Sequence, residues 1–147
     1  MSKALWRDAL RTHRERTPFD FVDSLSPAIL RALFDQSAIG IAMVDSEGHL
    51  LLVNGAFGAI TGHDPEALNG RSFLSITHPE DVKRVTRLIE KADSDGKESI
   101  TYDPRNVRQN ESVVWVRATV SRLRDEAGTV VAFASFIQDV TTERLAV

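Results

Sequence analysis

The sequence predicts an α+β fold in which helices cover one face of an antiparallel sheet. Two pairs of apolar, β-branched stretches are each joined by a short turn that contains glycine, within residues 40–54 and 112–139. Between them, residues 55–92 carry apolar side chains at helical spacing. Because strands and helices do not alternate regularly, we expect an antiparallel sheet rather than a parallel one.

The first hairpin is predicted from residues 40–45 and 49–54, which flank Ser46-Glu47-Gly48. Glycine in such a turn supplies the positive φ that a tight hairpin needs. The second hairpin joins residues 112–124 to 129–139. In its first strand, apolar Val116 and Ala118 alternate with polar or aromatic residues, so the two sets are expected on opposite faces.

The middle of the chain is predicted to be helical, with a short helix at residues 55–61, a short turn at 65–68 and a longer helix at 79–92. The acidic residues Asp64, Glu66, Glu80 and Asp81 stand where helices begin, so we interpret them as dipole and capping carboxylates. One more strand is predicted at residues 99–107. It contains Pro104, which lacks an N–H and therefore indicates an edge strand.

The N-terminal part is predicted to be helical. Residues 3–16 have an amphipathic pattern, and Thr17-Pro18 ends it. A second helix is expected from Ser26, with Ser26 as the N-cap and Pro27 in the first helical position. We therefore divide the chain into a helical extension (residues 1–26), a compact domain (27–140) and the start of an outgoing helix (141–147).

The amino-acid composition limits the class of protein to which the chain can belong. With 147 residues, 42% hydrophobic and 27% charged, the chain suits one globular domain. It has no apolar run long enough to span a membrane, and without Cys it can form neither a disulfide nor a thiolate site, which weakly favours the cytoplasm. Residues 1–16 are basic, and we interpret this as a solvated helix face rather than a nucleic-acid contact. No nucleophile–base pair or phosphate loop is visible, so we expect no enzyme activity.

The stretch IGIAMVDSEGHLLLVNGAFGAITGHDPEALNGRSFLSITHPEDV (residues 39–82) resembles the first half of a PAS sensor domain. ESVVWVRATVSRLRDEAGTVVAFASFIQDVTTER (residues 111–144) resembles its closing strands and terminal Asp-x-Thr. The resemblance implies a PAS fold, with a five-stranded antiparallel sheet in the order 2-1-5-4-3 and helices on one face. It also implies a sensor or interaction module.

Cofactor expectations follow from comparison with that family. Flavin-binding light sensors of the family carry a reactive Cys in the segment that matches residues 69–74, and this sequence has none there. Haem-binding members use a His in the long helix, whereas residues 82–92 contain no His. His78 and His63 are interpreted as capping and packing residues, and no His pair is spaced for a metal. No cofactor is predicted; haem through another ligand and non-covalent flavin stay open, as does an unknown small ligand.

The resemblance also implies a mostly apolar pocket between helices and sheet, although the same residues could simply fill a core. Asn54 is a polar candidate for it, but capping the following helix would explain that residue as well. The candidate pocket residues are Met43, Asn54, Phe57, Ile60, Phe73, Val85, Leu88, Ile89, Val116, Ala118, Phe133 and Ser135.

The outer face of the sheet is expected to need cover, because Val113 and Trp115 lie there. In the family an N-terminal helix often packs on this face or pairs in a dimer. We predict a homodimer through this face and the side chains of Leu5, Trp6 and Leu10. A monomer whose own helix folds back on the sheet is the competing arrangement.

At the C-terminus, Asp139 and Thr141 stand where the last strand would pass into an outgoing helix. In the family this segment connects sensor to effector, so we predict a signal hinge here. The expected whole is a regulatory module of a longer histidine kinase, diguanylate cyclase or phosphodiesterase, or transcription regulator. A stand-alone dimerisation or partner-binding protein is the alternative.

Overall fold

The computed structural model describes residues 24–145. The chain separates into two units, residues 1–34 and 35–147, and each is described by itself. The predicted helix at residues 3–16, with Leu5, Trp6 and Leu10, lies outside the described residues. Helix α3 (Pro27–Gln36) begins as predicted. The Ser26 hydroxyl accepts a hydrogen bond from the backbone N–H of Ile29 at 3.2 Å, and no residue of this helix is buried.

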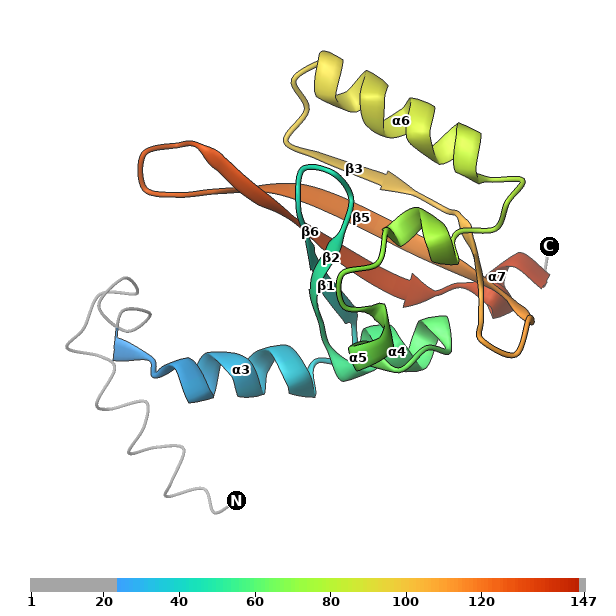
Figure 1. The fold of residues 1–147 in the computed structure, drawn as a ribbon, viewed down its shortest axis with the longest axis horizontal. Coiled ribbons are helices and arrows are strands. Elements are labelled where there is room, and N and C mark those ends of the chain that lie inside the picture. Colours follow the sequence, from blue (N-terminus) through green and yellow to red (C-terminus); the bar gives the residue numbers. More distant parts are fainter. Residues whose placement is uncertain (1–23, 146–147) are drawn as a thin grey trace. The chain divides into compact units, whose positions relative to one another are not determined.

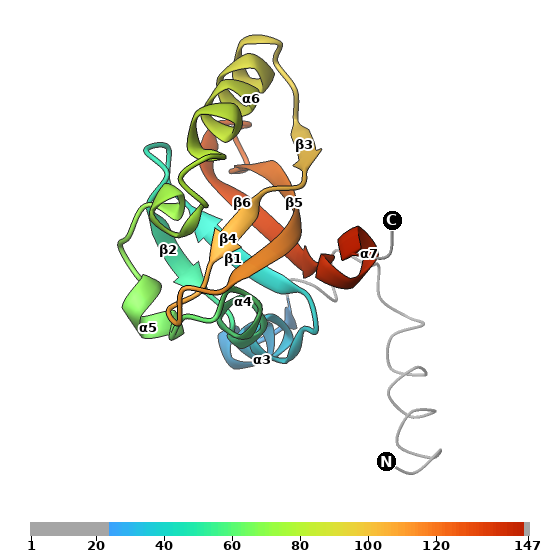
Figure 2. The same ribbon diagram turned by 90° about the vertical axis from the view of Figure 1, so that its right-hand side faces the viewer.

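Within the described residues, one antiparallel sheet contains six strands in the order β2-β1-β6-β5-β3, and β4 also pairs with β5 (Figures 1 and 2). The strands are β1 (Gly40–Val44), β2 (Leu50–Val53), β3 (Ser99–Tyr102), β4 (Arg105–Val107), β5 (Val113–Arg124) and β6 (Val130–Asp139). The α+β PAS fold is therefore confirmed.

The sheet differs from the prediction in one strand. The stretch expected to be a single strand, residues 99–107, is divided at Asp103-Pro104 into β3 and β4, and both pieces pair with β5. Because Pro104 has no N–H, the ladder cannot continue through it. With this strand counted as one, the observed order equals the predicted 2-1-5-4-3.

Four short helices and one longer one complete the domain. They are α4 (Gly55–Thr61), α5 (Pro65–Leu68), the 3₁₀ helix η1 (Phe73–Ile76), α6 (Val82–Ser94) and α7 (Thr141–Leu145). Side chains of α4, η1 and α6 line one cavity together with side chains from the sheet. These three helices therefore lie over the same face of the sheet, which we call the inner face.

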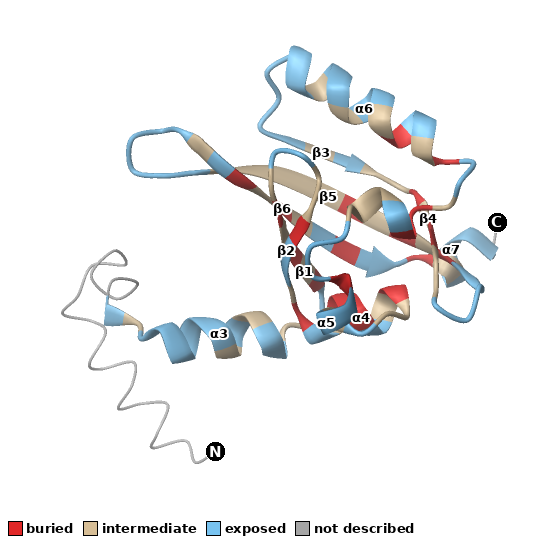
Figure 3. Cartoon of the chain, in the orientation of Figure 1, coloured by how far each residue is buried: buried red, intermediate tan, exposed pale blue. Residues whose placement is uncertain are grey.

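Strand register defines the two faces. On β5, Val116 and Ala118 are buried on the inner face, and Ile137 of β6 lies opposite Ala118. The residues between them point to the outer face, where Thr119 pairs with Phe136. In Figure 3 the buried positions lie mainly on the strands and on α4, whereas α6 is mostly intermediate or exposed.

Helix α4 packs unusually close to β1. A Cβ added to Gly40 would lie 2.9 Å from the Cα of Phe57 and 2.5 Å from a side-chain carbon of Ile137. Only glycine fits between these groups without a shift of backbone. Asn54 fixes the same junction, because its Oδ1 accepts hydrogen bonds from the N–H groups of both Phe57 and Ile41, each at 2.9 Å.

Candidate functional site

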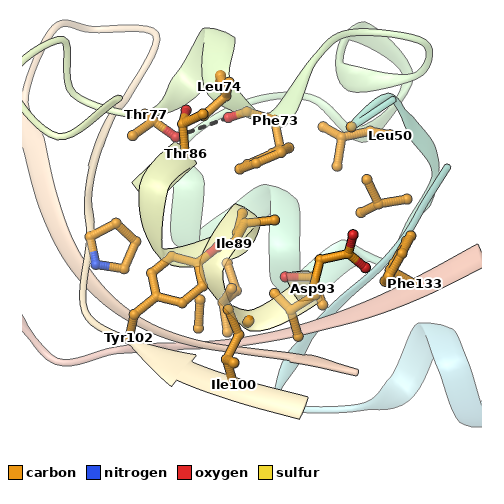
Figure 4. Close-up of a pocket in the computed structure, with 18 of the residues that line it drawn as sticks. Leu50, Phe73, Leu74, Thr77, Thr86, Ile89, Asp93, Ile100, Tyr102 and Phe133 are labelled. Carbon is orange, nitrogen blue, oxygen red and sulfur yellow. Dashed lines mark hydrogen bonds between the residues drawn. The ribbon is translucent and has the colours of Figure 1, made fainter. Parts of the chain in front are cut away.

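A cavity of about 520 Å³ lies between the inner face of the sheet and the helices (Figure 4). This volume falls within the range of small-molecule sites in proteins. The walls are mostly apolar, with Phe73 from η1, Ile89 from α6 and Phe133 from β6 facing the same space. The domain therefore contains a cavity rather than a fully packed core.

More than half of the predicted pocket residues line this cavity. They come from α4, η1, α6, β5 and β6, so the resemblance indicated residues of both layers. These residues are Phe57, Phe73, Ile89, Val116, Ala118, Phe133 and Ser135. Whether they bind a ligand stays a prediction.

Two predicted pocket residues point elsewhere, and these assignments were wrong. Met43 alternates with the buried Ala42 and Val44 of β1, so its side chain lies on the outer face. A one-residue shift in a strand moves a side chain to the opposite face. Leu88 lies on the solvent side of α6 and is 39% exposed.

Three further candidates lie near the cavity without lining it. Val85 is buried at 1% exposure and serves as core under α6, while Ile60 packs against the core from α4. Asn54 is fully buried as the N-cap of α4, and its amide group also donates to the carbonyl of Ile39 at 3.1 Å. Asn54 is thus a structural junction rather than a pocket residue.

The structure adds lining residues that the sequence reasoning missed. Tyr102 of β3 and Asn106 of β4 face the cavity from the divided edge strand, and Arg122 faces it from the far end of β5. Residues 99–107 were interpreted only as an edge strand. The register of that strand against Ala118 and Val114 would have been the signal, because both partners lie on the inner face.

Two of these residues, the buried Asn106 and the half-buried Tyr102, have polar side-chain groups without a hydrogen-bond partner among the described residues. The side chain of Asn106 makes no hydrogen bond with any residue that the structure describes, although Asn106 is only 6% exposed. The same holds for the hydroxyl of Tyr102 among residues 24–145, and it points into the cavity towards Ile89 (Figure 4). Burial raises the pKa of Tyr102 to about 12, so this phenol is neutral.

The other end of the cavity is charged and more exposed. Arg122 donates to Asp93 at 2.9 Å and lies 3.7 Å from Glu98. Arg124 donates to Glu98 at 2.6 Å, and this bond lowers the pKa of the Glu98 carboxyl. The guanidinium group of Arg122 is therefore already compensated by carboxylates of its own chain.

On the outer face, the start of α7 is attached to the sheet. The backbone N–H of Trp115 donates to the hydroxyl of Thr141 at 3.0 Å. The guanidinium group of Arg144 lies 4.5 Å from the centre of the Trp115 ring, and that of Arg105 lies 5.4 Å from it. Trp115, which was predicted to lie in a dimer face, is thus covered within its own chain.

The predicted hinge residues have different partners. Asp139 accepts from the N–H of Thr141 at 2.9 Å, as expected for a residue at a helix start. Thr141 does not cap the helix; its hydroxyl bonds β5 instead. Ion pairs add to this attachment, with Arg144 at 3.3 Å from Asp103 and Arg117 at 3.5 Å from Glu143.

An ion pair between the buried Asp81 and the half-buried Arg105 holds the start of α6 to β4. Asp81 stands at the N-cap position of α6, but its side chain makes no capping hydrogen bond. Its carboxylate accepts instead from the backbone N–H, Nε and Nη2 of Arg105, at 2.8 to 3.0 Å. These hydrogen bonds lower the pKa of Asp81 to about 2. The interpretation of Asp81 as a capping carboxylate was therefore wrong, whereas Asp64 does cap α5.

The histidines within residues 24–145 have structural partners. His78 accepts from the N–H of Glu80 at 3.1 Å, and His63 lies 2.9 Å from the carbonyl oxygen of Val107. Within residues 24–145, no cluster of His, Asp or Glu is arranged to hold a metal ion. The cavity walls contain neither His nor Met, so they offer haem iron no imidazole or thioether ligand.

A helix-covered antiparallel sheet around a small-molecule-sized cavity defines a class of sensory α+β modules. The family model described as PAS fold matches residues 34–145, and the chain belongs to the PAS family. It is a sensory module of the kind found in signalling proteins.

Curated relatives are much longer proteins. "Probable diguanylate cyclase DgcE" of Escherichia coli is 33% identical over 80% of this chain but only 11% of its own length. "Sensor histidine kinase TmoS" of Ectopseudomonas mendocina is 27% identical over 82% of this chain and 12% of its own length. The chain thus spans about a tenth of these relatives, and the match concerns the PAS region rather than their whole activities.

Solved structures show the same fold. A PAS domain from Colwellia psychrerythraea covers 80% of this chain and 99% of its own, with TM-score 0.71 and 19% identity. An RNA-binding light-oxygen-voltage receptor covers 84% of this chain and 38% of its own, with TM-score 0.72 and 25% identity. Among the described residues, no helix is long and apolar enough to cross a membrane.

Proposed function

We propose that this PAS domain senses a small organic ligand in the cavity and transmits occupancy through the attachment of α7. The main support is that β5 and β6 both line the cavity and hold the start of α7. Val116 of β5 and Ile137 of β6 line the cavity. Trp115, next to Val116, is hydrogen-bonded to Thr141, the first residue of α7, which follows β6 after Val140. A ligand that moves these strands would therefore act directly on the hinge.

A second connection runs through the edge strand. Pro104 lines the cavity, and the neighbouring Asp103 pairs with Arg144 of α7 and, at 3.2 Å, with Arg117 of β5. Transmission requires two states that the ligand binds unequally. In our proposal these states are α7 held on Trp115 and α7 released from it.

The signal would pass to an effector in a longer protein. The curated relatives carry a diguanylate cyclase or histidine kinase name, which supports an output of this kind. We propose such an effector for this chain, with the PAS domain itself non-catalytic and the protein located in the cytoplasm.

We propose no cofactor. The sequence has no Cys for a flavin adduct, and the arginine at the cavity is paired with carboxylates instead of being free for a flavin phosphate. A flavin held without a covalent bond would need other partners for its phosphate. An absorption spectrum of the purified protein tests this, because a flavin or haem band would contradict it.

Ligand sensing is tested by extracting bound small molecules from the purified protein and identifying them by mass spectrometry. We expect one bound compound, in stoichiometric amount, that is absent from the Ser135→Leu variant, whose larger side chain enters the cavity. Ser121→Leu is the matched control, because Ser121 of β5 lies on the outer face opposite Ala134. A compound retained by both variants would place its site elsewhere.

A homodimer is a second candidate function, supported by the outer face near β1 and β6. Phe136 is 38% exposed and Leu52 is 50% exposed, and both share this face with Ile41 and Met43 by register. We propose a second copy of the chain as the partner of this surface. Its position differs from the original prediction, which centred on Trp115.

A further inference from the structure

The cavity has two ends of different chemistry. Asn106 pairs with Val114 near the beginning of β5, whereas Arg122 lies near its end. At about 3.3 Å per residue, the inner face between Val116 and Arg122 is about 20 Å long. The cavity is therefore elongated, with the buried amide of Asn106 at one end and exposed charges at the other.

The buried end requires a partner. An amide that is buried without hydrogen bonds costs free energy, and most buried side-chain amides are satisfied. Asn106 is more than nine-tenths buried and has no side-chain partner among the described residues. Its amide can donate and accept at once, which suits a carbonyl or amide group of a ligand.

The exposed end disfavours anions. Five carboxylates and two cationic groups belong to its wall: Asp45, Glu47, Glu90, Asp93 and Glu98, with Lys97 and Arg122. Arg122 is already engaged by Asp93 and Glu98. Glu90 makes no ion pair with any described residue, so its charge faces the opening uncompensated.

We propose that the cavity binds an organic ligand with an apolar body, an amide-like group that hydrogen-bonds with Asn106, and no negative charge. This inference rests on the proposed ligand-sensing function and adds the chemical class. The hydroxyl of Tyr102 faces the same cavity and offers the ligand a second polar contact. Fatty acids and other organic acids are excluded as the main ligands by this assignment.

Two probes of nearly equal shape test the charge and the amide together. 4-Butylbenzamide and 4-butylbenzoate have the same apolar body, but only the first is neutral and carries an amide. By titration calorimetry we expect the benzamide to bind wild-type protein at least tenfold more tightly than the benzoate. Equal affinities, or a tighter benzoate, would overturn the inference while leaving the cavity as a ligand site.

The Asn106→Leu variant tests the role of the amide. Leu has nearly the same size and needs no hydrogen bond, so we expect an unchanged or raised Tm and about tenfold weaker binding of the benzamide. A lowered Tm with unchanged affinity would show that Asn106 has a structural role, and would overturn the assignment.

The Glu90→Lys variant tests whether the negative charge at the exposed end of the cavity disfavours anionic ligands. Reversing this charge is expected to strengthen binding of the benzoate about threefold at low salt, because exposed charges are screened as salt rises. Glu126→Lys, in the exposed turn between β5 and β6, is the control and should leave the affinity unchanged. Equal effects of both variants would contradict a local role of Glu90.

The two levels of the proposal can fail separately. If neither probe binds at millimolar concentration, the ligand class is overturned, and the extraction experiment still decides whether the cavity holds a ligand. If extraction yields an organic acid, sensing is supported and the class is wrong.

Discussion

The hydroxyl of Thr141 accepts a hydrogen bond from the backbone N–H of Trp115 at 3.0 Å, and so joins the start of α7 to the middle of the sheet. The next backbone group, the carbonyl of Trp115, accepts from the N–H of Val140 at 2.9 Å. Both groups of Trp115 are therefore used to hold the exit of the domain, and loss of the hydroxyl should loosen it.

We expect Thr141→Val to free α7 from β5 while the rest of the domain stays folded. The variant keeps the shape of the side chain but leaves the Trp115 N–H without its acceptor, at a cost of about 1 to 3 kcal/mol. Amide hydrogen exchange of Trp115 reports this directly and should accelerate at least fivefold. Thr142→Val, one residue along, is the control and should not change it.

Asp81→Asn should destabilise the domain by about 2 kcal/mol at neutral pH, since the pKa of Asp81 is lowered from 3.8 to about 2 in the folded protein. A carboxyl group whose pKa is lowered by folding stabilises the folded state at pH values above its pKa in the unfolded chain. That stabilisation is lost as the pH falls from about 4 to about 2. Urea unfolding at several pH values should therefore show wild type and variant converging in this window, and a difference that is constant with pH would contradict the assignment.

Gly40→Ala should cost about 1 to 3 kcal/mol, because the added methyl group meets the backbone of Phe57 and the side chain of Ile137. Gly55→Ala is the matched control: nothing lies within 4 Å of its added Cβ, and alanine favours the helix. Thermal unfolding should separate the two variants in opposite directions. Similar losses for both would argue against the close packing of α4 on β1.

Phe136→Lys should weaken self-association without unfolding the monomer, since Phe136 is partly exposed on the outer face. Light scattering coupled to gel filtration should show a dimer for the wild type and a monomer for the variant. Val131→Lys is the control. Val131 is more exposed, at 60%, and lies near the other end of β6, where the register with β5 shifts. A monomeric wild type would reject the proposed dimer.

The strands could be predicted because the two hairpins carry strong local signals, whereas their order was implied by the resemblance to the PAS family. Gly48 has the positive φ expected of the first turn, and Pro104 marks the edge strand. The division of that strand could not be predicted, since it depends on where β5 offers partners. Helix starts were also local, as Ser26 and Asp64 show.

The candidate site was only partly predictable. Phe73 was found through the resemblance to the PAS family, and Ile89 also because apolar residues at helical spacing face a core. Met43 was misplaced because β1 is short, so its alternation was ambiguous without the register to β6. Asn106 and Tyr102 were missed because burial of a polar residue in an edge strand depends on helices distant in sequence.

The partners of charged residues were the least predictable feature. Asp81 has the sequence position of a helix cap, yet its carboxylate accepts hydrogen bonds from Arg105, which is 24 residues away. Arg144 likewise reaches Asp103 across 41 residues. Such pairs arise from the fold as a whole and leave no local signal.

The central claim is that filling the cavity releases α7 from Trp115, and Trp115 fluorescence tests it most directly. Trp6→Phe removes the other tryptophan, since the chain has two. In this background Arg144→Ala gives the emission of an uncovered Trp115. After any copurified ligand has been removed from all samples, we predict that Ser135→Leu shifts the emission maximum to longer wavelength, towards the Arg144→Ala value, while Ser121→Leu leaves it unchanged. An emission maximum in Ser135→Leu equal to that of the Ser121→Leu control would contradict the claim.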